Sequence, residues 1–252
     1  VNDDAMLTAD QQEVDNMIST LDRIGGTATF NGKSLLDGSL GATGAAVGDN
    51  VRFVGAKTST KDSPTEGYEV DIVQVATQAY KRGSVPLTVN NIGEGVTILL
   101  SEGGRNVEID TKMGKEKENI EEILANHKQF PARFPADQAS ADIRGVVMQS
   151  IKEGIAESGL ALEAFETPEK ALYIRHKNFG TESTFSVTSN IPGLLTNNAN
   201  IAELSEAGLD VAGRIGGTFA SGNGQYLTAI EGASPAKGIT IQFDRTIGLK
   251  EV

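Results

Sequence analysis

The stretch that decides the architecture spans residues 7–38 and reads LTADQQEVDNMISTLDRIGGTATFNGKSLLDG. Apolar side chains recur in it at the i, i+3, i+4, i+7 spacing that places one stripe along a helix, namely at Val14, Met17, Ile18, Leu21 and Ile24. Thr8 followed three residues later by Gln11 is typical of a capping box, and Gly25-Gly26 is typical of a helix C-terminus. We therefore predict an amphipathic helix from Thr8 to Ile24.

A tight hairpin is predicted directly after this helix. In Phe30-Asn31-Gly32-Lys33, the Asn-Gly pair tolerates the positive φ values of a reversed two-residue turn. Leu35 and Leu36 follow as a second apolar anchor. The residues leave two interpretations of the helix open, because its stripe suits packing on its own domain as well as packing against a partner helix.

The segment DRIGGTATFNGKSLLDGS, residues 22–39, resembles the helix-to-hairpin segment of bacterial flagellins. The matching positions are Asp22, Arg23, Phe30, Asn31, Gly32, Lys33, Leu35 and Leu36. The resemblance implies that residues 1–42 and 244–252 belong to a flagellin-type helical core domain. Residues 43–243 would then form a surface-exposed, β-rich insertion domain of one or two subdomains.

Composition excludes several classes of protein. The 252 residues carry a formal net charge of −12, which disfavours binding to nucleic acid or to an anionic membrane. The chain has no cysteine, so it has neither disulfides nor a thiolate metal site. We find no secretory signal and no apolar run long enough to span a bilayer. With only 5% aromatic residues, the core is expected to consist of Val, Ile, Leu and Ala.

Alternating apolar residues predict a β-rich region after a linker at residues 38–50. Glycine and asparagine clusters such as Gly103-Gly104 and Gly216-Gly217 predict hairpin turns between its strands. We expect strands near residues 68–73, 85–89, 96–100, 106–110, 172–176, 184–188, 211–215, 226–230 and 239–243. Apolar periodicity predicts helices over 116–128 and 140–158, each covering a sheet. The fold class is therefore α+β, an amphipathic helix and hairpin joined to antiparallel strands with two covering helices.

A second resemblance lies within this region. EGYEVDIVQVATQA, residues 66–79, resembles a strand segment of filament-cap proteins and of some flagellin insertions. GLDVAGRIGGTFASGNGQYLTA, residues 208–229, resembles a hairpin of flagellin insertions. The order of these segments behind the flagellin-like hairpin favours a protein of the flagellar apparatus.

The sequence favours no enzymatic function. Its two histidines, His127 and His176, lie in no metal-ligand spacing; we interpret the first as a helix-boundary residue and the second as an exposed strand residue. No nucleophile elbow is present. The carboxylates of Glu116, Glu118, Glu121 and Glu122 are interpreted as a solvated helix face. We expect no catalytic residue, no metal and no cofactor.

The flagellin resemblance implies an extracellular structural subunit of the flagellar filament, which serves motility and is exported without a cleavable signal peptide. It implies packing through Val14, Met17, Ile18, Leu21, Ile24, Phe30, Leu35 and Leu36. The implied partners are other copies of the chain in a helical filament, flagellar export and cap proteins, and a Toll-like receptor contacted by Glu13. The alternatives are a filament-cap or hook-junction protein and a surface adhesin that binds glycans.

Overall fold

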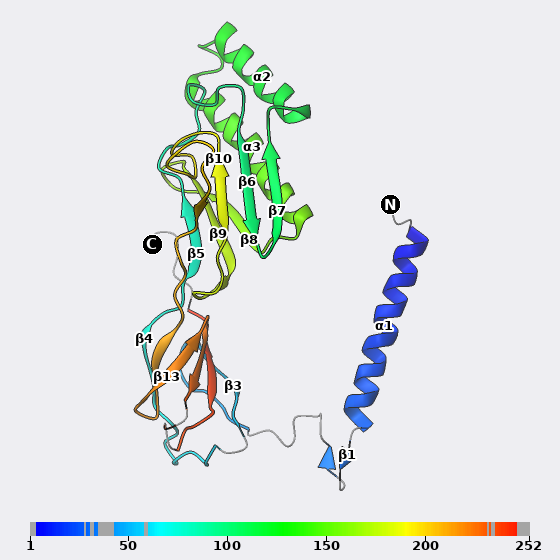
Figure 1. Ribbon diagram of the computed structural model, residues 1–252, viewed down its shortest axis with the longest axis vertical. Helices are drawn as coiled ribbons and strands as arrows, with labels where there is room; N and C mark the ends of the chain where they lie inside the picture. Colours follow the sequence, from blue (N-terminus) through cyan, green and yellow to red (C-terminus); the bar gives the residue numbers. More distant parts are fainter. Residues whose placement is uncertain are drawn as a thin grey trace.

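The computed structural model describes residues 4–27, 29–30, 33–34, 43–57, 60–230, 232 and 235–245. It has the predicted α+β architecture, with three helices and only antiparallel strand pairs among its named strands. Figure 1 shows helix α1 apart from two β-rich parts that lie end to end. We call these the six-stranded part and the helical part.

Helix α1 spans Asp4–Thr27, and the short strands β1 (Thr29–Phe30) and β2 (Lys33–Ser34) follow it. Phe30 pairs with Lys33, which confirms the predicted hairpin. The predicted ends of the helix are wrong, because Thr8 lies inside α1 and the helix continues through Gly25 and Gly26. A glycine costs a helix only about 1 kcal/mol relative to alanine, so a glycine pair does not by itself end it.

The six-stranded part is one antiparallel sheet built from two distant chain segments, 51–74 and 212–243. Its strands, in spatial order, are β3 (Val51–Gly55), β15 (Thr240–Phe243), β14 (Tyr226–Ala229), β13 (Thr218–Asn223), β12 (Ala212–Ile215) and β4 (Val70–Gln74). Gly216 and Gly217, at φ 61° and 79°, form the predicted turn between β12 and β13. Glycine has no Cβ to oppose these left-handed angles.

The helical part occupies the chain between β4 and β12. One sheet has the order β11 (Glu203–Leu204), β10 (Ser186–Ser189), β6 (Thr97–Glu102) and β7 (Arg105–Asp110). The other has the order β5 (Gln78–Arg82), β9 (Leu172–Phe179) and β8 (Leu162–Glu166). Helix α3 (Ala136–Ser158) packs on β7 and β8, and α2 (Gly114–Gln129) packs on α3.

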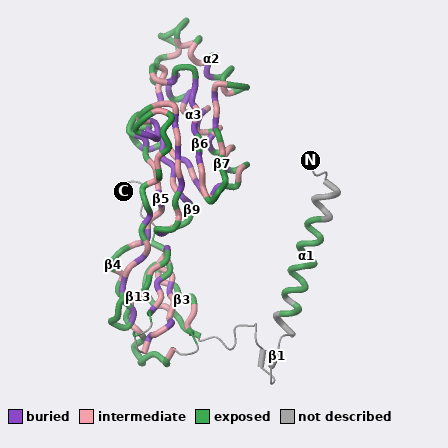
Figure 2. The backbone as a smooth tube through the Cα atoms, viewed as in Figure 1, coloured by how far each residue is buried: buried purple, intermediate pink, exposed green. Residues whose placement is uncertain are grey.

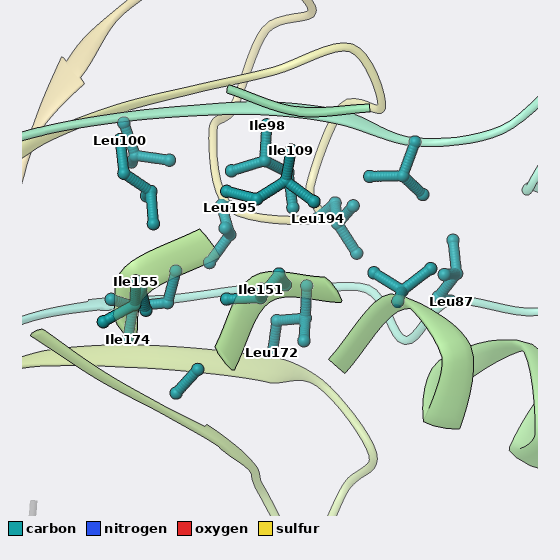
Figure 3. Close-up of a cluster of buried hydrophobic side chains, with 14 of the residues drawn as sticks. Leu87, Ile98, Leu100, Ile109, Ile151, Ile155, Leu172, Ile174, Leu194 and Leu195 are labelled. Carbon is teal, nitrogen blue, oxygen red and sulfur yellow. The ribbon is translucent and has the colours of Figure 1, made fainter. Parts of the chain in front are cut away.

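Helices α2 and α3 both confirm the predicted apolar periodicity, but the prediction that each covers a sheet is right only for α3, because α2 packs on α3. On α3 the buried side chains include Ile143, Val147, Ile151 and Ile155, which recur every four residues. They join Ile98, Leu100, Ile109, Leu172 and Ile174 in the larger core (Figure 3). The smaller core lies on the six-stranded sheet and contains Val211, Ile215, Leu227 and Ile241. Figure 2 shows buried backbone in both parts, whereas the described residues of α1 are exposed.

The prediction of a strand at Val85–Val89 is wrong. This segment is a loop in which Asn91 Nδ2 donates to the Pro86 carbonyl at 2.9 Å and Asn91 Oδ1 accepts from the Thr88 backbone NH at 2.7 Å. Such local side-chain bonds compete with a strand ladder.

Strands β3, β5, β8, β11 and β13 lie outside the predicted ranges. Polar or small residues occupy most positions of β5 and β13, so no apolar alternation marks them. β3 and β8 do alternate, at Val51 and Phe53 and at Leu162 and Ala164, and were missed despite that signal.

Candidate assembly surface and the joint between the two β-rich parts

The residues of the predicted packing stripe on α1 are exposed to solvent. Its five members, Val14, Met17, Ile18, Leu21 and Ile24, are between 48% and 67% exposed. Five large apolar side chains in contact with water on one helix face are unusual for an isolated chain, and such a face normally packs against another element. The described residues thus leave the stripe exposed, and which element packs on it, one of its own domain or a partner helix, stays a prediction.

Between the stripe residues, the side chains of α1 whose burial is described are polar and exposed. Gln11 Nε2 donates to Asp15 Oδ1 at 2.9 Å and Thr20 Oγ1 donates to the Asn16 carbonyl at 2.8 Å, both within the helix. Glu13, the residue implied in receptor contact, is exposed. Of the other predicted packing residues, Phe30 lies in β1, whereas Leu35 and Leu36 lie outside the described residues.

The two β-rich parts are connected twice by the chain, through residues 75–77 and 205–211. Thr77 binds the two connections together. Its NH donates to the Leu209 carbonyl at 2.9 Å, and its hydroxyl accepts from the Leu209 NH at 2.9 Å. The Thr77 carbonyl accepts from the NH of Gly180, at the end of β9, at 3.0 Å. We call this region the joint.

The carboxylate of Asp210 is the polar centre of the joint. Its Oδ1 accepts from the backbone NH of Gly224 at 2.7 Å and of Thr181 at 3.3 Å, and its Oδ2 accepts from the Thr181 hydroxyl at 2.7 Å. Burial raises the pKa of Asp210, but the bonds from Thr181 and Gly224 outweigh it and hold the pKa below its ordinary value. Asp210 thus links the six-stranded part to the end of β9 as a charged acceptor.

Close backbone packing requires glycine in the joint. A Cβ on Gly208 would lie 2.6 Å from the Thr77 carbonyl oxygen and 2.7 Å from that of Gly180. Gly180 has φ 102°, and a Cβ there would lie 2.9 Å from the Gly224 backbone. Phe179 adds an apolar contact by packing against the smaller core. The joint therefore combines hydrogen bonds, close backbone contact and one aromatic anchor, so the two parts are closely packed there.

The histidine predictions have different outcomes. His176 is only 3% exposed, so its interpretation as an exposed strand residue is wrong. Its Nδ1 accepts from the Asn178 NH at 2.9 Å, and its Nε2 lies 3.4 Å from Glu102 Oε1. The period-two series Leu172, Ile174, His176 places it on the inner face of β9, a signal that its charged neighbours obscured. His127 Nδ1 lies 2.7 Å from the Phe134 carbonyl at the half-buried edge of α2, as a boundary residue should.

The described residues contain no group of three or more histidines and carboxylates arranged to hold a metal ion. In that same portion of the chain, each helix is too short or too polar to cross a bilayer. Glu118, Glu121 and Glu122 are exposed on α2 and Glu116 is half-exposed, which confirms the solvated face.

No protein-family model matches the chain, and no curated protein matches its sequence. The chain is similar in part to several solved structures. One contains the D2-D3 domains of the flagellar cap protein FliD from Serratia marcescens, with 10% sequence identity and a TM-score of 0.42. This match covers 81% of this chain and 97% of that one. The same domains from Escherichia coli match at 8% identity and TM-score 0.38, covering 79% and 94%. FliD from Bdellovibrio bacteriovorus matches at 15% identity and TM-score 0.39, covering 77% and 95%. These three structures are named as flagellar cap proteins, and none of the three is named as a flagellin.

Proposed function

We propose that this chain is a non-enzymatic structural part of a bacterial flagellum that self-associates through α1. The single observation that carries the proposal is the exposed stripe from Val14 to Ile24 on a helix that continues into a flagellin-like hairpin. Burying such a stripe against copies of itself releases water from apolar surface and stabilises the assembly by about 25 cal/mol per Å² buried.

The joint supports an outward-projecting role for the two β-rich parts. Because Thr77, Asp210 and Gly208 hold the parts together by short contacts, a force applied to the helical part is transmitted to the six-stranded part. A projection whose two parts are closely packed suits a component on the outside of a rotating assembly.

Two assemblies are consistent with this role. The hairpin segment at residues 22–36 favours a filament subunit, which repeats as a heterologous contact along a helix. The segment at residues 66–79, which forms β4, the first connection and the start of β5, favours a filament cap. Both assemblies place the chain outside the cell and use α1 as the packing element.

The adhesin alternative has less support. Tyr80 and Tyr173 stack on each other with ring centroids 5.4 Å apart, and Tyr173 is buried. Tyr68 donates its hydroxyl to the Asp62 carbonyl at 3.0 Å. Glycan sites need a free aromatic face, and these three rings make contacts within the chain, whereas Tyr226 is 45% exposed. Recognition of Glu13 by an innate receptor stays a prediction.

The test is electron microscopy of the full-length protein that contains this chain, after an assembly trigger. We expect filaments from a flagellin-type subunit, and rings or capped plates from a cap. In either case the variant Met17→Glu with Leu21→Glu should abolish the assembly, because two charges would have to be buried in the packing stripe.

The matched control is Gln12→Glu with Ser19→Glu, which adds the same charge on the opposite face of the helix. This control should assemble like the unmodified protein. Assembly that survives the stripe variant, or that is lost equally in both, would contradict the proposed role of α1.

A further inference from the structure

A shallow groove of about 400 Å³ lies between α3 and β8 in the helical part. Its floor consists of small and apolar residues, namely Ala141, Gly145, Met148 and Phe165. Gly145 lies in the middle of α3, is exposed, and has no atom within 4 Å of where its Cβ would be. The floor is therefore open to a side chain from outside.

The rim of the groove is basic. Arg144 Nε lies 2.9 Å and Lys170 Nζ 3.2 Å from the carboxylate of Glu166, and Lys152 is exposed beside them. Three cations against one carboxylate leave an excess of positive charge. The chain as a whole has a net charge of −12, so this groove attracts an acidic surface such as most of the same molecule presents.

The aromatic part of the floor is held in place before any partner binds. The guanidinium of Arg175 lies 4.7 Å from the centroid of the Phe165 ring. Arg175 is itself held by Glu163, whose Oε2 accepts from Nε at 3.1 Å and from Nη2 at 3.0 Å. A fixed ring loses little conformational entropy on binding, which favours a docking surface.

A complementary surface lies on the outer face of the β6–β7 hairpin. Leu99 is 38% exposed there, and Glu108 is its direct cross-strand neighbour. Asp110 lies on the same face, opposite Thr97. The inner-face residues Ile98, Leu100 and Ile109 pack in the core under α3, so the Leu99 face points away from that helix. It presents one apolar side chain flanked by carboxylates.

We propose that the groove of one copy binds the Leu99 face of the β6–β7 hairpin of a second copy. Leu99 would occupy the floor beside Gly145 and Phe165, and Glu108 would lie near Lys152. Because the two surfaces are different and face different directions, the contact is heterologous and propagates from copy to copy. This inference rests on the proposed self-assembly and adds to it an outer contact that is independent of α1.

The test uses the absence of cysteine in the natural chain. Two single-cysteine variants of the whole chain, Gly145→Cys and Leu99→Cys, are mixed and oxidised under mild conditions. A disulfide requires Cβ atoms about 4 Å apart, so only a contact of the proposed kind links them efficiently. We expect the mixed dimer to exceed the dimer of either variant with itself by about tenfold. The control mixture replaces Leu99→Cys by Val54→Cys, a position in the six-stranded part that is 49% exposed and so at least as accessible as Leu99.

Charge reversal then tests the rim. Lys152→Glu should lower the mixed-dimer yield by about threefold to tenfold, and Glu108→Lys in the partner variant should restore it. A yield equal to that of the Val54→Cys control, or a Gly145→Cys dimer with itself as the main product, would overturn the inference. A yield that does not respond to charge reversal would overturn it as well.

The same experiment in the Met17→Glu, Leu21→Glu background separates the two proposals. Crosslinking should persist there, because the groove does not involve α1. Loss of filaments without loss of crosslinking would confirm both interfaces as independent. Normal assembly of the full-length protein with no crosslinking would overturn the groove contact and leave the proposed function standing.

Discussion

The carboxylate of Asp210 lies 2.7 Å from the backbone nitrogen of Gly224, and this bond ties the connection that leads into β12 to the turn after β13. The same carboxylate binds Thr181 in the helical part at 2.7 Å. One side chain thus joins the two β-rich parts, which predicts a measurable role for Asp210 in stability.

Asp210→Ala should lower the free energy of unfolding by about 1–3 kcal/mol, because it leaves the NH groups of Gly224 and Thr181 without their acceptor. The measurement is urea denaturation followed by circular dichroism. Asp62→Ala is the control, since Asp62 is exposed and the hydrogen bond it accepts goes to its backbone carbonyl. Equal midpoints for both variants would contradict the role of Asp210.

The change in the free energy of unfolding with pH should include a contribution from the titration of Asp210. Its pKa is lowered in the folded state, so its contribution is fully present above the ordinary aspartate pKa of about 3.9 and is lost as the pH falls further. Unfolding free energies measured between pH 7 and pH 2 should therefore fall less steeply below pH 4 in Asp210→Asn than in the unmodified chain. Parallel curves would show that other carboxylates carry the acid sensitivity.

Two glycine-to-alanine variants should change stability in opposite directions. Gly208→Ala should destabilise by at least about 2 kcal/mol, because its Cβ would meet the Thr77 and Gly180 carbonyl oxygens and the crowded backbone has to move. Gly145→Ala should stabilise by up to about 1 kcal/mol, because it has open space and alanine favours the helix. Thermal denaturation of both variants checks this, and a shift of the same sign in both would refute it.

Because His176 is buried, replacing it should lower the free energy of unfolding more than replacing its exposed charged neighbour Lys177. His176→Ala should destabilise by about 2–4 kcal/mol, because it opens a cavity between β9 and the larger core and removes the acceptor of the Asn178 NH. Lys177→Ala, one residue later and exposed, should stay within about 0.5 kcal/mol of the unmodified chain. The comparison is made by urea denaturation at pH 7, and similar costs for the two variants would place His176 outside the core.

Local pattern alone determined several elements of this protein. The four-residue recurrence from Ile143 to Ile155 predicted α3, and the Gly103-Gly104 and Gly216-Gly217 pairs predicted hairpin turns that the structure confirms at positive φ. The stripe from Val14 to Ile24 was likewise readable, because helical periodicity depends only on residues within a few turns of one another. The prediction of α+β follows from these local signals.

Only the tertiary structure decided which distant segments meet. Phe53 of β3 pairs with Ile241 of β15 across most of the chain, and Asp210 reaches Thr181 and Gly224 through the joint. The groove beside Gly145 also exists only once sheets and helices pack. Such contacts gain their free energy from burial and close approach between residues far apart in sequence, after the entropy of closing long loops has been overcome. No local periodicity predicts these long-range contacts, whereas the apolar spacing that predicts a helix depends only on residues within a few turns of one another.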